Sequence, residues 1–469
     1  MGVLVVTLLL ACADSVARLP PGHPSQPDLV LVSIDSLRAD HLGSYGNPRD
    51  VSPFLDQLAA SGLRFENALA SSPWTLPSHV TMLSGRGPLE HNVIEDDRRI
   101  PGDLPLVAER LRDAGYATGG FVSTIYVSSD YGFDRGFDTF VDYDLTKTGN
   151  LQRQVRAEKL VDDALAWLSA QPGKPAFLFV HLYDVHYPYL PPEPWGARYD
   201  KPGTKKSTRY KNYAYYKTHP LTDKQLEHQR AQYDECIRYV DDQLARLHAA
   251  LERAGRKNTW VVTADHGEEF GERGSWGHAH TLHPEVMRVP LIVSDQPPAV
   301  RQERAGVIDV APTLMALAGL SMDTTGLSLL GPLPSARDWP METSRFDTAK
   351  LSLVSGLSRV EIDNDARVAY DWSRDPGERQ AAPATPEQVA AAWAAVGEAW
   401  TATSVVRSPG SMWSGGTLLA HEVPAGSRFA LYPPDATVLG EAQRTPPLPP
   451  RMELSDDTRE QLEALGYQQ

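Results

Sequence analysis

The feature that most constrains the fold is a series of short, almost uninterrupted apolar runs rich in β-branched residues. Residues 28–35 read DLVLVSID, residues 176–184 read AFLFVHLYD, residues 259–265 read TWVVTAD and residues 289–293 read VPLIV. Apolar runs that do not alternate with polar residues are typical of strands buried on both faces. The chain is therefore expected to build an internal sheet covered on both sides.

Amphipathic segments separate these runs, and a long helix is expected over residues 222–254. Strands that alternate with helices predict an α/β fold, with a large, mostly parallel β-sheet flanked by helices. With 469 residues, 41% of them hydrophobic, the chain can bury such a core. Beyond residue 345 the sequence becomes rich in Pro, Ala and Ser, so we expect a catalytic domain over residues 28–345 and a smaller C-terminal subdomain over residues 346–469.

The N-terminus begins with the apolar sequence MGVLVVTLLLACADS. This run is too short to span a bilayer and has the length of a signal-peptide core. Its LLAC sequence resembles a bacterial lipoprotein signal, which predicts a signal peptide over residues 1–12, lipidation of Cys12 and a Pro-rich tether over residues 13–27. A simple cleaved signal or a misassigned start of a cytosolic protein are the alternatives. The expected location is the bacterial envelope, as a lipid-anchored protein or free in the periplasm.

The formal net charge of −15 disfavours nonspecific nucleic-acid binding, because phosphate backbones need a basic face. The only cysteine besides Cys12 is Cys236. A disulfide framework is therefore excluded, and we expect Cys236 to pack in the core.

Polar side chains follow three of the expected strands at their carboxyl ends. Asp35 closes the first run, Asp184 and His186 close or follow the second, and Asp265 and His266 close the third. Because ligands of open α/β sheets bind outside the carboxyl ends of the strands, these side chains are expected to share one rim. A single Asp at a strand end is usually a turn former or a helix cap, but several equivalent positions together indicate a site.

Several anions in one cleft repel one another unless a cation lies among them, so the cluster predicts a divalent metal ion. Oxygens of Asp35, Asp265 and Thr75 with an imidazole nitrogen of His266 make a mixed ligand set. That set suits Zn, Mn or Mg better than a pure Ca cage.

Thr75 lies in the sequence SSPWTLPSHVTMLSG, residues 71–85, just before a Leu-Pro pair suited to the first turn of a helix. Helix N-termini favour a negatively charged oxygen, and a hydroxyl becomes a nucleophile when a base or metal activates it. Either Thr75 is such a nucleophile, or it is simply the N-cap of this helix.

Five segments, in this order, resemble the sulfatase branch of the alkaline phosphatase superfamily: LVSIDSLRADHLGSYG, PWTLPSHVTMLSG, VHLYDVHYPYLPP, TADHGEEFGERGSWGHAHTL and VPLIV. The tail pieces YDWSRDPGER and EQLEALGY are similar to the same branch. The resemblance implies a large α/β sheet sandwich with a smaller C-terminal subdomain. It also implies three metal ligands and a nucleophile that contacts the metal: Asp35, Asp265, His266 and Thr75.

The resemblance further implies that His186 and His280 contact the transferred group or protonate the leaving oxygen, with His278 as a competitor for that role. Asp184 and His186, with His280, are the alternative ligands of a second metal ion. Arg38 is expected either to bind an anion or to form a structural salt bridge.

The chain departs from the family pattern around the nucleophile. A typical sulfatase has Cys or Ser in Cys-x-Pro-x-Arg, which is oxidised to formylglycine, whereas residues 75–79 here read TLPSH. Threonine cannot become formylglycine, because its β-carbon carries a methyl group and oxidation would give a ketone. His79 replaces the arginine that helps to hold the nucleophile. Ser36 stands where many sulfatases have a further aspartate ligand, which weakens a calcium assignment.

These departures favour attack on phosphorus by an unmodified Thr75. The expected function is a metal-dependent hydrolase or transferase of phosphate or sulfate esters, with a lean towards phosphoesters and one divalent ion (Zn, Mn, Mg or Ca). Its substrate is expected to be a small-molecule, glycan or lipid ester. One alternative is a true sulfuric ester hydrolase without formylglycine, and another is a non-catalytic glycan-binding lipoprotein.

Overall fold

The computed structural model describes residues 19–143, 155–200, 213–343, 345, 350–363, 366–392, 412–414, 417–420 and 449–451. The predictions for the signal peptide and Cys12 lie outside the described residues. From Leu19 onward the expected tether packs against the domain. Leu19 is buried, the carbonyl of Pro20 accepts from Arg256 Nη1, and the carbonyl of Pro21 accepts from the Gly173 amide. These residues therefore belong to the folded unit.

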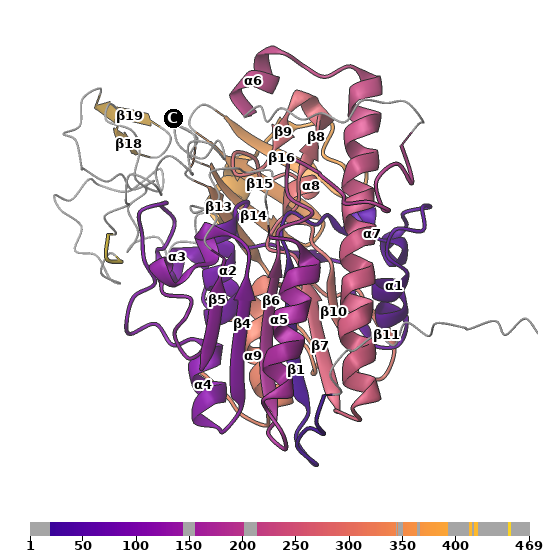
Figure 1. Ribbon diagram of the computed structural model, residues 1–469. Helices are drawn as coiled ribbons and strands as arrows, with labels where there is room; N and C mark the ends of the chain where they lie inside the picture. Colours follow the sequence, from indigo (N-terminus) through magenta and orange to yellow (C-terminus); the bar gives the residue numbers. More distant parts are fainter. Residues whose placement is uncertain are drawn as a thin grey trace, which may run out of the picture.

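A mixed, mostly parallel sheet of eight strands forms the centre of the molecule (Figure 1). Strand β1 lies between β6 and β7 and runs parallel to both, whereas β10 runs antiparallel to its neighbours. The expected α/β fold class is confirmed. In spatial order the strands are β11 (Ala299–Arg301), β2 (Leu63–Phe65), β10 (Leu291–Val293), β7 (Asn258–Thr263), β1 (Asp28–Ile34), β6 (Ala176–Leu182), β4 (Ala117–Val122) and β5 (Thr139–Asp142).

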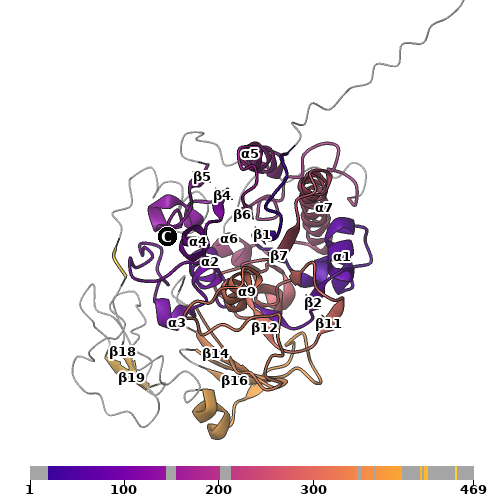
Figure 2. The same ribbon diagram turned by 90° about the horizontal axis from the view of Figure 1, so that it is seen from below.

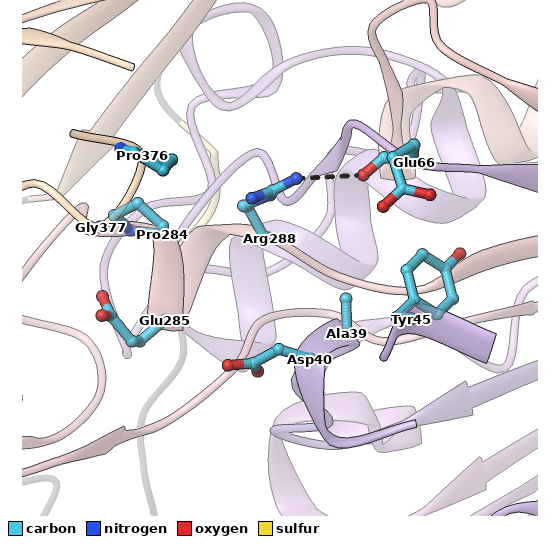
Figure 3. A pocket seen from close by; sticks show the side chains of 9 residues that line it. All are labelled: Ala39, Asp40, Tyr45, Glu66, Pro284, Glu285, Arg288, Pro376 and Gly377. Atoms are coloured by element: carbon cyan, nitrogen blue, oxygen red, sulfur yellow. Dashed lines mark hydrogen bonds between the residues drawn. The ribbon is translucent and has the colours of Figure 1, made fainter. Parts of the chain in front are cut away.

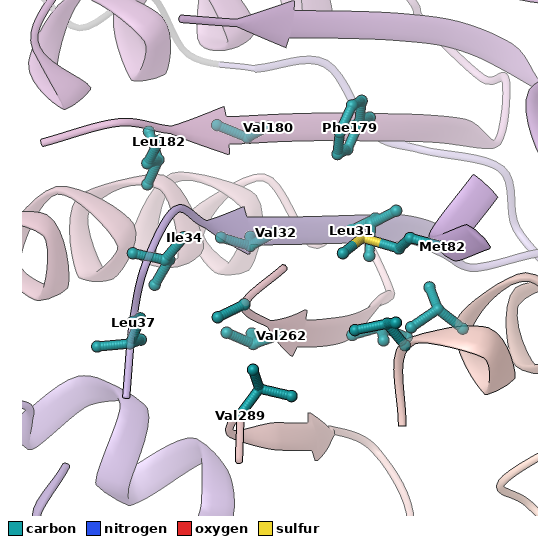
Figure 4. Close-up of a cluster of buried hydrophobic side chains, with 14 of the residues drawn as sticks. Leu31, Val32, Ile34, Leu37, Met82, Phe179, Val180, Leu182, Val262 and Val289 are labelled. Atoms are coloured by element: carbon teal, nitrogen blue, oxygen red, sulfur yellow. The ribbon is translucent and has the colours of Figure 1, made fainter. Parts of the chain in front are cut away.

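The central strands are buried along their whole length, as the uninterrupted apolar runs predict. Figure 4 shows the side chains of Leu31, Val32, Phe179, Val180 and Val262 stacked across neighbouring strands. Each such side chain stabilises the fold by about 1.5–3 kcal/mol relative to an exposed one.

Helices cover both faces of the sheet (Figure 2). Helices α1 (Pro53–Ala60), α5 (Ala157–Ser169) and α7 (Asp223–Arg253) lie on one face. Helices α2 (Thr75–Ser84), α4 (Val107–Asp113) and α9 (Val310–Leu317) lie on the other. Thr222 caps α7 by accepting from the Gln225 amide, so the long helix begins and ends within one residue of the expected limits. The shorter helices are α3 (Pro88–His91), α6 (Tyr213–Thr218) and α8 (Pro284–Met287).

A second, antiparallel sheet forms the smaller subdomain. It begins at Trp339, so its first strand precedes the boundary expected after residue 345. The indole N–H of Trp339 donates to the Ala70 carbonyl, and the Thr343 hydroxyl donates to the Ala279 carbonyl. The subdomain thus docks against loops at one end of the main sheet. Its strands are β13 (Trp339–Thr343), β14 (Lys350–Ser355), β15 (Ser358–Ile362), β16 (Arg367–Asp371) and β17 (Ala382–Pro383).

Three two-stranded ladders and several short 3₁₀ helices accompany these elements, and the ladders pair β3 (Ala68–Leu69) with β12 (Ala305–Gly306), β8 (Glu269–Phe270) with β9 (Trp276–Gly277), and β18 (Met412–Ser414) with β19 (Thr417–Ala420). Among the described residues, none of the helices has the length and apolar character needed to cross a bilayer.

Candidate active site

The carboxyl ends of β1 and β7 bring an acidic cluster together. Asp35 directly follows β1, and Asp265 and His266 follow β7, the neighbouring parallel strand. Ligand atoms of these three buried residues all lie within 4.8 Å of one another. The adjacency of the two strands explains why residues so far apart in the sequence meet at one point.

Two of the four carboxylate oxygens in the cluster have hydrogen-bond donors among the described residues, and two have none. Asp35 Oδ1 accepts from Ser36 Oγ at 2.8 Å, and Asp265 Oδ1 accepts from the backbone amides of Ser36 and His266. The Oδ2 atoms of Asp35 and Asp265 are buried without a hydrogen-bond partner in the described part of the chain. Unpartnered buried carboxylate oxygens are costly, and a divalent cation satisfies both.

His266 presents a nitrogen to the same point. Its Nδ1–H donates to the Gly267 carbonyl at 2.9 Å, which leaves the lone pair of Nε2 to face the cluster. Nε2 lies 3.3 Å from Asp265 Oδ2 and 3.9 Å from Asp35 Oδ1. The donor set of two carboxylates and one imidazole fits a divalent ion such as Zn or Mn.

Burial affects the two carboxylates of the cluster differently. Burial and the neighbouring Asp35 carboxylate raise the pKa of Asp265 to about 6. Burial also opposes ionisation of Asp35, but contact with His181 and the nearby imidazoles of His186 and His266 lower its pKa below the ordinary range. Asp35 therefore stays ionised to lower pH than Asp265 does.

Thr75 is the first residue of α2, and Trp74 occupies the N-cap position. The interpretation of Thr75 as the N-cap is therefore wrong. Its Oγ1 lies 3.4 Å from His266 Nε2. The Ser78 hydroxyl donates to the Asp265 carbonyl at 2.7 Å, which ties the first turn of α2 to the end of β7. The helix thus places the Thr75 hydroxyl beside the acidic cluster.

Ser36 has a backbone φ of 60°, in the left-handed region that is uncommon for serine. The Tyr233 hydroxyl holds this conformation by donating to the Ser36 carbonyl at 2.7 Å and accepting from the Arg38 amide at 2.8 Å. The turn aims the Ser36 amide at Asp265 and its hydroxyl at Asp35. Ser36 therefore supports the carboxylates where many sulfatases have another ligand.

His79 lies one turn below Thr75 and is fully buried. Its Nδ1–H donates to the Thr75 carbonyl at 2.9 Å, and its Nε2 accepts from Ser33 Oγ at 2.9 Å. Burial lowers the pKa of His79 well below its ordinary value, so the ring is neutral. The structure therefore assigns His79 to holding the backbone of Thr75 through Nδ1, while Nε2 fixes the ring against Ser33.

Two further histidines adjoin the cluster. The ring of His278 lies 4.3 Å from that of His266 and 5.0 Å from that of His186, between centroids. Its Nδ1–H donates to Glu268 Oε1 at 2.9 Å, and the His186 Nδ1–H donates to the Tyr187 carbonyl at 2.7 Å. Burial lowers the pKa of His186 to about 4 and that of His278 well below its ordinary value. Both rings are therefore neutral near pH 7.

His280 lies in different surroundings. Its Nε2 accepts from the Ser275 hydroxyl at 2.7 Å, and its Nδ1–H donates to the His278 carbonyl at 2.6 Å. Of the two competing histidines, His278 is the one whose ring packs beside His266.

Asp184 points to helix α5. Its Oδ2 accepts from the Ala157 amide, in the first turn of α5, at 2.9 Å, and Arg156 Nη1 lies 3.6 Å from Oδ1. Burial raises the pKa of Asp184 to about 6. Helix capping therefore accounts for the contacts of this carboxyl group.

Arg38 is buried and forms a structural ion-pair network. Its guanidinium donates to Asp40, to Glu272 Oε1 and to the Glu268 carbonyl. The salt-bridge interpretation of Arg38 thus accounts for its contacts.

His181 was missed by sequence reasoning. It lies inside β6, is fully buried, and places Nε2 3.4 Å from Asp35 Oδ2. A polar residue in the middle of the run AFLFVHLYD is the one signal that would have marked it.

A small cavity of about 200 Å³ lies apart from this cluster, where α8 and the second subdomain meet the main domain (Figure 3). Arg288 crosses it and donates to the Glu66 carbonyl. None of the acidic cluster's residues lines it. Its lining consists of Ala39, Asp40, Tyr45, Glu66, Pro284, Glu285, Arg288, Pro376 and Gly377.

The sequence around this site matches a known protein family. The family model described as Sulfatase matches residues 27–320, which include the whole acidic cluster and Thr75. The chain belongs to the sulfatase family. This membership confirms the resemblance of the ordered motifs and places the chain among ester hydrolases.

Proteins similar in sequence include sulfatases. The chain is 27% identical over 347 residues to the uncharacterized sulfatase YidJ of Escherichia coli (strain K12), covering 63% of this chain and 68% of that protein. It is 24% identical over 367 residues to a choline-sulfatase of Rhizobium meliloti (strain 1021), covering 65% and 71%.

Among solved structures, the fold is similar to that of a phosphonate monoester hydrolase from Silicibacter pomeroyi. The TM-score is 0.66 and the identity 20%, and the match covers 80% of this chain and 94% of that one.

Proposed function

We propose that this protein is a metal-dependent hydrolase or transferase that cleaves phosphate or sulfate esters through Thr75, with a preference for phosphate esters. The observation that carries the proposal is the position of the Thr75 hydroxyl, 3.4 Å from Nε2 of His266, which belongs to the same cluster as the two unpartnered carboxylate oxygens. A nucleophile, a cation site and a helix N-terminus therefore converge on one point.

Asp35, Asp265 and His266, with the Thr75 hydroxyl, would hold one divalent ion. When bound, such an ion supplies positive charge that favours the deprotonated hydroxyl and attracts an anionic substrate. The amides in the first turn of α2 add hydrogen-bond donors for the oxygens of the transferred group.

The proposed reaction has two displacements. Thr75 Oγ1 forms a bond to phosphorus while the bond from phosphorus to the leaving oxygen breaks. Water or an acceptor alcohol then attacks phosphorus and releases Thr75. In the first displacement the proton of the Thr75 hydroxyl passes through Nε2 of His278, which Glu268 orients, to the leaving oxygen. In the second, His278 takes a proton from the attacking water or alcohol and returns it to Thr75, while His186 contacts the transferred group.

The identity of the nucleophile supports phosphorus as the preferred centre, because threonine has no route to formylglycine. A sulfuric ester hydrolase that uses the unmodified hydroxyl is the second candidate, supported by the sulfatase relatives. The buried ligand set and the adjacent hydroxyl together disfavour a non-catalytic glycan-binding protein.

The decisive assay compares turnover of nitrophenyl phosphate monoester, phosphate diester and sulfate by Mn- or Zn-loaded protein lacking residues 1–18. Thr75→Ala is the inactive control, and Thr75→Ser, which keeps the hydroxyl, is expected to retain activity. Phosphate ester turnover that Thr75→Ala abolishes supports the proposal. Dominant sulfate turnover contradicts the preference for phosphorus.

We also propose export to the bacterial envelope with a lipid on Cys12, which would bring the enzyme close to glycan or lipid esters. Incorporation of a labelled fatty acid by the full-length chain, lost in Cys12→Ala, is the expected result. An unlabelled, periplasmic full-length chain contradicts the lipid anchor.

A further inference from the structure

We propose that His181 is a positioning residue for Asp35, whose Oδ2 receives the Nε2–H of the buried imidazole. The inference concerns a side chain that lies within the sheet, behind the acidic cluster. It rests on the metal site proposed above and extends it by one residue.

The His181 ring is buried and lacks hydrogen-bond partners within the described chain. His181 has no exposed surface, and neither of its ring nitrogens has a hydrogen-bond partner among the described residues. Side chains alternate along a strand, so His181 shares its face of the sheet with the buried Phe179, and both rings contact His79. Leaving a polar group unpaired in such surroundings costs about 1–3 kcal/mol, so a partner is expected in the working protein.

The carboxylate oxygen nearest to the ring also lacks a hydrogen-bond partner within the described chain. Nε2 of His181 lies 3.4 Å from Asp35 Oδ2, an oxygen that is itself buried and unpartnered within the described chain. The strands fix this approach, because β1 and β6 are paired with Ser33 opposite His181. A donor and an acceptor without partners therefore face each other at a set register.

His181 is also linked to the nucleophile Thr75, through His79. Its ring contacts that of His79 edge-on, with centroids 4.8 Å apart. His79 in turn holds the Thr75 carbonyl and the Ser33 hydroxyl. The two rings thus connect the ligand Asp35 to the first turn of α2, so that ligand and nucleophile are fixed together.

A direct ligand role is the competing interpretation. The described residues whose ligand atoms all lie within 4.8 Å of one another are Asp35, Asp265 and His266, and His181 is outside that group. Within the described chain, Asp35 is the carboxylate that comes within 4 Å of its ring nitrogens. Donation to Asp35 therefore fits the placement better than coordination.

The test measures Mn²⁺ affinity by isothermal titration of the protein lacking residues 1–18, without substrate. His181→Leu removes the donor and is expected to weaken binding about 10–100-fold. His181→Gln keeps an N–H donor near the Nε2 position. Its Mn²⁺ affinity is therefore expected to stay within about threefold of wild type.

The matched control is His91→Leu, which removes another buried histidine, one that bonds Thr81 and the Val93 amide away from the cluster. It should lower the melting temperature without changing Mn²⁺ affinity. If His181→Leu binds Mn²⁺ like wild type, or His181→Gln binds as weakly as His181→Leu, the positioning role is wrong.

Cobalt substitution separates donor from ligand. The visible absorption of the Co²⁺ protein should keep its shape in His181→Gln, and a change of shape would show that His181 coordinates the ion and overturn the proposal. Because these readouts need no turnover, wild-type binding without activity would refute the proposed function alone. Absence of Mn²⁺ and Co²⁺ binding by wild type would refute the metal site and this inference with it.

Discussion

His278 and His280 are separated by a single alanine, yet their side chains have different neighbours. The His278 ring packs beside His266, whereas His280 is held by Ser275 and by the backbone of its own loop. Loop conformation makes this distinction, and a sequence pattern cannot.

His278→Asn is therefore expected to lower kcat by about 10²–10⁴-fold, the contribution of a general acid–base group. His280→Asn should lower kcat by less than about tenfold, since its contacts with Ser275, the His278 carbonyl and Glu269 support the loop. Steady-state kinetics on the best aryl ester provide the comparison. A larger loss in His280→Asn than in His278→Asn would reverse the assignment of roles.

The residues of the cluster could be predicted to different degrees. Asp35, Asp265 and His266 were accessible because the ends of parallel strands meet at one rim. His181 was not, because a histidine inside an apolar strand gives no indication of which face it occupies or what it touches. The role of Asp184 was predicted only as one of two alternatives, since a carboxylate at a strand end can bind a metal ion or cap a helix from another part of the chain.

At the scale of single elements, the cap of α5 makes a prediction of its own. Asp184→Ala leaves the Ala157 amide without its acceptor, so the free energy of unfolding is expected to fall by about 1–3 kcal/mol. Urea denaturation measures this loss.

Metal content distinguishes the two interpretations of Asp184. Asp184→Ala should still bind one equivalent of metal, as should Asp162→Ala, which removes an exposed carboxylate of the same helix. A loss of one of two equivalents in Asp184→Ala alone would establish the second metal site.

Strand β13 contains a buried acid that makes stability depend on pH. Burial raises the pKa of Glu342 to about 8. The folded protein therefore binds this proton more tightly than the unfolded chain does. The contribution of Glu342 to the free energy of unfolding is most favourable below its unfolded pKa of 4.5 and declines as the pH rises towards 8.

Glu342→Gln removes this titration. Its free energy of unfolding should rise relative to wild type between pH 5 and pH 8, by up to about 1.4 kcal/mol per pH unit. Urea denaturation at both pH values measures the difference, with Glu387→Gln as an exposed control. A difference between wild type and Glu342→Gln that does not change with pH would refute the raised pKa.

The strands were easier to predict than the direction in which they pair with their neighbours in the sheet. The apolar runs predicted β1, β6 and β7 because strands buried on both faces leave no other pattern. The antiparallel direction of β10 was not predictable, since VPLIV reads the same in either direction of pairing. The smaller subdomain was foreseen from a change of composition and from the family resemblance, whereas the order and pairing of its short strands were not.

For the whole molecule, the acidic cluster couples metal binding to stability. Two unpartnered buried carboxylate oxygens destabilise the metal-free fold, and an ion that binds only the folded state stabilises it by about 2.7 kcal/mol at one hundred times Kd. Mn²⁺ should therefore raise the melting temperature of wild type, and EDTA should reverse the rise.

Asp265→Asn is expected to abolish that response, because it removes a ligand while keeping the shape of the side chain. An equal rise in wild type and Asp265→Asn would mean that the ion binds elsewhere.

The central claim is that Thr75 carries the transferred group during turnover. The most direct measurement is peptide mass spectrometry of metal-loaded protein quenched in acid during turnover of a phosphate ester. We predict a phosphoryl adduct on the peptide that contains Thr75, absent in Thr75→Ala. Turnover by Thr75→Ala, or steady turnover of wild type with the Thr75 peptide never labelled, would contradict the account.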